Sequence, residues 1–105
     1  RLTTEEKNIK IGDIGFIRAE VIDKNGNICP QATNKLQIKV TGTGIYKASG
    51  NGDPNNLESF SKPVRSLFSG AATIYIQGKK SGEIFITAKS EGLLMNRTII
   101  ECKIK

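Results

Sequence analysis

Five runs of this chain alternate apolar with polar residues, and this period of two constrains the fold more than any other feature. The apolar positions are Ile17, Ala19 and Val21, then Leu36, Ile38 and Val40, then Ala72, Ile74 and Ile76, then Ile84, Ile86 and Ala88, and last Ile100, Cys102 and Ile104. Successive side chains of a strand point to opposite faces, so each set shares one face that has to be buried. The alternation therefore predicts strands that each bury one face in a common core.

Turn-forming residues separate these runs. Residues 23–27 (DKNGN) predict a tight turn, because Asn25 and Gly26 supply the positive φ angles of a hairpin. Further breaks are expected at residues 41–44, 79–82 and 90–93. Residues 45–48 predict a short extra strand, the segment around Leu2 an edge strand, and residues 55–61 at most one helical turn. About seven short strands predict an all-β, immunoglobulin-like antiparallel β-sandwich, although the chain lacks the tryptophan of antibody cores.

The length of 105 residues fits a single domain, residues 1–105. The chain begins at Arg1 rather than at an initiator methionine, and we expect it to be a fragment of a larger multidomain protein. No run approaches the ~20 apolar residues of a membrane span, so no membrane partner is predicted. No apolar leader reveals the compartment, and we favour a periplasmic or secreted bacterial location.

Sixteen Lys and Arg against ten Asp and Glu give a net charge of +6. Such a balance is typical of proteins that bind nucleic acid or another anionic surface. The lysines are scattered, however, and only Lys79 and Lys80 are adjacent, whereas phosphate recognition usually concentrates the charge on one face. We therefore expect a solvated β surface and no nucleic-acid partner.

The two cysteines are Cys29 and Cys102. A disulfide is open to them in an exported protein, while buried free thiols behave as small hydrophobes. Cys102 is in phase with Ile100, which favours free thiols. The chain has no histidine, and two cysteines are too few for a zinc site, so no metal and no cofactor are expected.

A long polar loop interrupts the strand pattern. It contains Gly50, Asn51, Gly52, Asp53, Pro54, Asn55, Asn56, Leu57, Glu58, Ser59 and Phe60. Loops of this length often carry a function. Asp53 and Glu58 have a spacing that a glycosidase pair would tolerate, and Asn51, Asp53, Asn55 and Glu58 offer oxygens for calcium. Neither set has oriented partners, and without histidine there is no conventional triad. We favour a hydrogen-bonded loop with no catalytic residue.

The outward-phase aromatic residues are Phe16, Tyr75 and Phe85. Sugar-binding platforms use exposed aromatic rings, above all tryptophan, and no strand here carries three of them. Direct sugar binding is therefore the weaker interpretation. The three rings predict an apolar surface that docks on a neighbouring domain.

Several segments resemble, in order, the C-terminal immunoglobulin-like domain of glycoside hydrolase family 2 enzymes, the bacterial β-galactosidases in particular. They are residues 21–27 (VIDKNGN), 40–42 (VTG) with Gly44, 50–54 (GNGDP), 58–60 (ESF), Arg65, Phe68 to Gly70, Gly82 and 87–93 (TAKSEGL). The GNGDP loop is the most specific of these segments. The resemblance extends from about Ile14 to the end of the chain.

The resemblance implies an accessory role. The family's catalytic glutamates belong to a separate (β/α)8 barrel, so this fragment alone is not expected to be an enzyme. Its expected partners are the other domains of a parent β-galactosidase that acts in carbohydrate degradation. We expect Arg65 to pair with Asp53 or with loop carbonyls and to pin the loop to the sandwich. The alternative function is an Ig-like spacer or binding module of a bacterial surface adhesin, although adhesin repeats usually lack the long loop.

Overall fold

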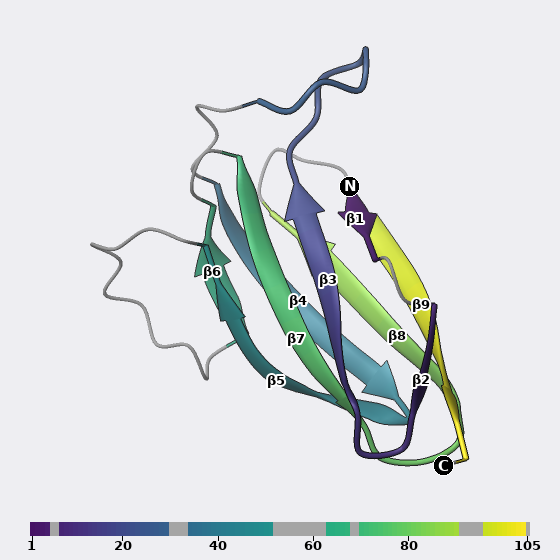
Figure 1. Cartoon of the computed structure of the whole chain (residues 1–105). Helices are drawn as coiled ribbons and strands as arrows, with labels where there is room; N and C mark the ends of the chain where they lie inside the picture. The colour runs from purple at the N-terminus through teal and green to yellow at the C-terminus, as the bar shows by residue number, and fades with distance from the viewer. Residues whose placement is uncertain (5–6, 30–33, 52–62, 68–69, 91–95, 105) are drawn as a thin grey trace.

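A computed structural model gives the fold, and it describes residues 1–4, 7–29, 34–51, 63–67, 70–90 and 96–104 (Figure 1). These residues form nine strands and no helix, and therefore include no helix that is long and apolar enough to cross a bilayer. The strands are β1 (Leu2–Thr3), β2 (Asn8–Lys10), β3 (Ile14–Glu20), β4 (Lys35–Gly42), β5 (Gly44–Gly50), β6 (Val64–Ser66), β7 (Ala71–Gly78), β8 (Gly82–Lys89) and β9 (Asn96–Lys103).

The strands make two stacked sheets. One has four strands in the order β1-β3-β7-β5, and the other has five in the order β2-β9-β8-β4-β6. All neighbours are antiparallel except β2, which runs parallel to β9. The order β1-β3-β7-β5 matches the ABED sheet of a constant-type immunoglobulin domain, and β9-β8-β4 matches its GFC sheet. The predicted all-β, immunoglobulin-like sandwich is confirmed.

The core lies between the sheets and consists of most of the predicted inward positions together with Leu2, Ile9 and Leu67. Ile17, Ile74, Ile76, Ile84, Ile86 and Ile100 are completely buried, and Leu36, Ile38, Ala72, Ala88 and Cys102 are nearly so. Val21 and Val40 pack against this cluster from partly exposed positions. The prediction for Ile104 is wrong: its side chain is 77% exposed, because β9 ends at Lys103 and no partner strand extends beyond it.

The turn predicted at residues 23–27 is confirmed. Gly26 has a φ of +85° and donates its backbone N–H to the Asp23 carbonyl at 3.0 Å. The Asp23 carboxylate accepts backbone N–H groups from Asn25 at 2.8 Å and from Asn27 at 3.0 Å. This is an Asx-type turn, in which one side chain satisfies two donors that the tight backbone leaves free.

The break predicted at residues 41–44 has a specific role in the topology. Here the chain leaves the five-stranded sheet at the end of β4 and enters the four-stranded sheet as β5. Gly42 has a φ of +85°, and a Cβ at this position would collide with the backbone carbonyl of Glu83. The crossing therefore requires glycine for both conformation and space.

Candidate functional site

The long loop starts at the end of β5 and returns at β6. These are edge strands of different sheets, and they lie on the same side of the sandwich (Figure 1). Gly52, Asp53, Pro54 and Glu58 lie outside the described residues, as do the helical turn expected over 55–61 and most of the calcium ligand set. The structure describes the base of the loop, where Gly50 and Asn51 close β5 and Arg65 lies in β6.

Arg65 is the largest fully buried side chain among the described residues, with 1% of its surface exposed. It pairs in register with Leu36 of β4, so it points inward rather than to solvent. Its Nε donates to Ser49 Oγ at 3.2 Å, and Ser49 Oγ lies 2.8 Å from the Tyr46 hydroxyl. A polar cluster thus joins β6 to β5 where the two sheets come together.

A second bridge crosses the same gap. The Asn51 side-chain amide donates to the Ser66 backbone carbonyl at 2.7 Å. Tyr46, Asn51, Arg65 and Ser66 each take part in at least one further interaction. Because a buried guanidinium is stable only when its donors find acceptors, this cluster fixes the two ends of the loop relative to each other. Among the described residues of this cluster, no general base lies beside a nucleophile.

The predicted docking residues do not share one surface. Phe16 of β3 and Tyr75 of β7 are directly paired on the outer face of the four-stranded sheet, with ring centroids 5.3 Å apart and planes at 80°. Phe85 lies on β8, in the other sheet. The Arg97 guanidinium lies 4.6 Å from its ring centroid, an arrangement typical of a cation–π contact. The three rings were predicted as one surface because outward phase alone does not say which sheet a strand joins.

The Phe16–Tyr75 pair belongs to a larger apolar patch. Ile14 of β3 and Ile45 of β5 both pair with Gln77, one row along the same face. Ile14, Phe16 and Ile45 are 38%, 51% and 41% exposed. We call Ile14, Phe16, Ile45 and Tyr75 the apolar patch. Sequence reasoning missed its isoleucines because neither was assigned to the outer face of a strand.

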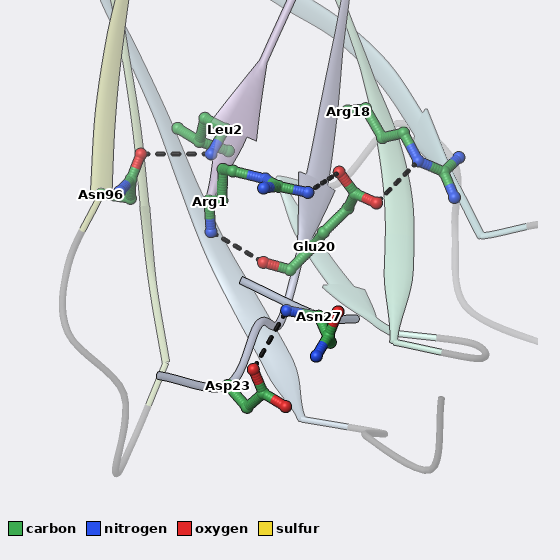
Figure 2. Close-up of polar contacts among 7 residues, drawn as sticks. All are labelled: Arg1, Leu2, Arg18, Glu20, Asp23, Asn27 and Asn96. Carbon is green, nitrogen blue, oxygen red and sulfur yellow. Dashed lines mark hydrogen bonds and ion pairs between the residues drawn. The ribbon is translucent and has the colours of Figure 1, made fainter. Parts of the chain in front are cut away.

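Glu20 is a second residue that sequence reasoning did not single out. Figure 2 shows Arg1 and Arg18 reaching its carboxylate from opposite sides, with one N–O distance of 3.4 Å each. Nearby, Asn96 accepts the Leu2 backbone N–H at 3.1 Å and so ties β1 to the start of β9. Glu20 is only 9% exposed although it is in the outward phase of β3. Alternation predicted an exposed position, and the two arginines explain why a carboxylate is stable there.

Glu20 also lines an open cavity of about 460 Å³ at this end of the sandwich. Leu36, Leu67 and Ala88 supply apolar walls, and Lys89 and Ser90 lie at its border. Among the described residues, no three acidic or cysteine side chains come together as metal ligands. Among the described lining residues, Glu20 is a single carboxylate held between two guanidinium groups, which is not the carboxylate pair of a glycosidase.

Both cysteines are free thiols, as predicted. Cys102 is buried in the core, and Cys29 is partly exposed. Burial, followed by the charge of Asp13, raises the pKa of the Cys102 thiol. The thiolate is therefore disfavoured, and Cys102 serves as a small core residue rather than as a nucleophile.

Comparison with known proteins shows which families and structures this chain is similar to. The family model described as glycoside hydrolase family 2 C-terminal domain 5 matches residues 1–98. Beta-galactosidase BoGH2A of Bacteroides ovatus is 39% identical over 82 residues, which cover 77% of this chain and 10% of that protein. A solved glycosyl hydrolase family 2 member from Bacteroides cellulosilyticus is 27% identical, with a TM-score of 0.92 over 98% of this chain and 14% of that chain. The chain thus spans a small part of the length of these relatives.

A further structural neighbour is the D0-D1 domain of Intimin. It is 18% identical, with a TM-score of 0.72, and the match covers 99% of this chain and 48% of that chain. Identity this low shows a shared fold and nothing more. The alternative interpretation as an adhesin module therefore gains no support from it beyond the fold.

Proposed function

Since this chain belongs to the C-terminal domain 5 family of glycoside hydrolase family 2, we propose that it packs on sibling domains of its parent enzyme through the apolar patch. As a member of that family it is a non-catalytic accessory domain, which agrees with the role implied by the sequence resemblance. The sheet core is filled by aliphatic side chains, so the function of the domain has to reside on its surface and in its loops.

The observation that supports packing through this surface is the concentration of exposed apolar side chains on the four-stranded sheet. Three large hydrophobic residues, Ile14, Phe16 and Ile45, are each more than a third exposed on one face, beside the partly exposed Tyr75. Exposed apolar patches of this kind mark contacts with other protein surfaces. Aromatic residues in particular are enriched at the centres of such contacts.

The activity of the parent enzyme is part of the proposal. The most informative named relative is a beta-galactosidase, and we infer that the parent cleaves β-galactosides or related glycosides with residues outside this chain. In this arrangement the domain fixes the geometry of its neighbours, and the long loop at the β5–β6 side is pinned by Arg65. Arg65 is buried at the loop base, which supports the pinning; its pairing with Asp53 remains a prediction.

The chain supplies a matched pair of variants to test packing. Ile45 and Ile99 are 41% and 45% exposed, but they lie on opposite outer faces. Ile45→Lys places a charge in the proposed interface, whereas Ile99→Lys does not. In the isolated chain both variants should change stability little, by about 0.5 kcal/mol or less, because both positions are already solvated.

In the parent enzyme the two variants should differ. Calorimetry and limited proteolysis should show the domain released from its neighbours only in Ile45→Lys, because a charge buried against an apolar surface costs several kcal/mol. Equal behaviour of the two variants in the parent would refute packing through the apolar patch.

A further inference from the structure

The outer face of the five-stranded sheet is basic. Its outward cations are Lys10, Lys35, Lys39, Lys89, Arg97 and Lys103, and its outward acids are Glu83 and Glu101. The acids face each other across β8 and β9, away from the end that carries Lys89 and Arg97. The fold therefore gathers on one face a charge that is scattered along the sequence.

Three of these cations surround a single position. Lys39 and Arg97 both pair with Thr87, one from each side, so they are about 10 Å apart across two strand spacings. Lys89 is two residues further along β8, at the diagonal position to Lys39. In the described part of the chain, none of Lys39, Lys89 and Arg97 forms an ion pair with a carboxylate.

The same end of this face is hollowed. An open depression of about 620 Å³ lies beside the cluster, and its described lining consists of Asn34, Lys35, Gln37, Lys89 and Ser90. Every one of these side chains is polar, and none is acidic. The Ser90 hydroxyl donates to the Lys35 backbone carbonyl at 2.8 Å, which ties the end of β8 to the start of β4 and shapes the wall.

The donor set of this depression fits a sugar that carries a carboxylate. The Lys89 ammonium group suits the carboxylate, and the amide and hydroxyl groups of Asn34, Gln37 and Ser90 suit ring hydroxyls. A volume of several hundred cubic ångströms is in the range of small-ligand pockets. The described lining holds no acidic side chain, so it does not resemble an acidic metal site.

Nucleic acid fits this surface less well. Single strands bind through stacking on exposed aromatic rings, and Phe85, the described aromatic residue on this face, already has the Arg97 guanidinium against it. Duplexes are read by an element that enters a groove, whereas these cations are presented by strands of a sheet.

We propose that this face binds a glycan containing uronic acid, with one carboxylated sugar in the depression and the following one along Lys39 and Arg97. The inference rests on the proposed function, because the basic face would give the parent glycosidase a surface that binds a carboxylated polysaccharide. It uses the sheet opposite to the apolar patch, so both surfaces are available at the same time.

Titration calorimetry of the 105-residue chain with an oligogalacturonate tests the proposal, with a neutral galacto-oligosaccharide and a single-stranded DNA oligonucleotide as competing probes. We expect an affinity of about millimolar or somewhat tighter for the oligogalacturonate alone. The double variant Lys39→Glu, Lys89→Glu should weaken it about tenfold, because two exposed attractions become repulsions. The control Lys79→Glu, Lys80→Glu carries the same charge change on the β7–β8 turn and should weaken it less than about twofold.

Three results would overturn the proposal. They are the absence of oligogalacturonate binding, equal weakening by the two double variants, and DNA binding that is as tight and equally sensitive to Lys39 and Lys89. Melting curves of both variants confirm that they are folded. The Ile45→Lys test in the parent enzyme leaves this face intact, so failure of packing and failure of glycan binding are measured separately.

Discussion

Removing the Ser49 hydroxyl should show how much this acceptor stabilises the buried Arg65 guanidinium at the loop base. Ser49 is completely buried on β5 and accepts the Arg65 Nε–H at 3.2 Å. In Ser49→Ala the guanidinium stays buried and loses this acceptor, while the Tyr46 hydroxyl loses its 2.8 Å partner. Tyr46 is only partly buried, so its hydroxyl can turn to water. The main cost therefore falls on Arg65.

The size of that cost follows from the geometry. Hydrogen bonds to charged groups contribute about 1.5–3 kcal/mol, and a length of 3.2 Å is at the long end of the range. We therefore expect Ser49→Ala to lower the free energy of unfolding by about 1.5–2 kcal/mol. For a domain of this size that corresponds to a fall in Tm of roughly 6–16 °C.

A double-mutant cycle isolates the interaction. Arg65→Met keeps most of the side-chain volume and removes the charge that needs the acceptor. In the Arg65→Met background, Ser49→Ala should cost less than about 1 kcal/mol, which leaves a coupling energy of about 1 kcal/mol. Urea unfolding followed by circular dichroism measures all four proteins. If Ser49→Ala costs the same with and without Arg65, the hydroxyl does not support the guanidinium, and the account of the loop base is refuted.

Two further predictions concern the core and the sheet crossing. Gly42→Ala should lower the free energy of unfolding by more than about 2 kcal/mol in urea titrations, because it combines a positive φ with a backbone collision at Glu83. The control Gly26→Ala, at a position with the same φ and open space, should cost about 1 kcal/mol. Equal costs of the two substitutions would contradict the role of the collision at Gly42. Alkylation of the folded protein should modify Cys29 and spare Cys102. The folded pKa of Cys102 is raised, so its stabilising contribution should be lost as pH rises past the unfolded pKa near 8.5. Cys102→Val should remove that loss of stability at alkaline pH.

The strands were predictable because the period-two pattern records burial directly. Each inward set that the structure buries was readable from alternation, as were the turn at residues 23–27 and the additional strand that became β5. Ile104 was not, since the pattern continues one residue beyond the last partner strand. Alternation tells which phase is apolar but not where pairing stops. β6 was also missed, because three residues are too few to display a period.

The site residues were harder to predict, and the reason is again physical. Arg65 was singled out by family resemblance, but its complete burial depends on β6 pairing with β4, which no local pattern reveals. Glu20 was assigned to an exposed phase, and its shielding by Arg1 depends on a contact between residues nineteen positions apart. Polar side chains acquire their roles from tertiary neighbours, so spacing along the chain predicts them poorly.

The division between inward and outward phases also explains why the surface of this domain can be tested without unfolding it. The inward side chains fill one close-packed core, and substitutions there create cavities or steric collisions that lower stability. Outward side chains such as Ile45 and Lys39 are not packed in this core, and substitutions there usually change the free energy of unfolding by about 0.5 kcal/mol or less. The fold gathers most exposed apolar side chains on the four-stranded sheet and most outward cations on the five-stranded sheet. The two faces differ in their main chemistry and point in opposite directions, so loss of packing and loss of glycan binding should each follow substitutions on one sheet alone.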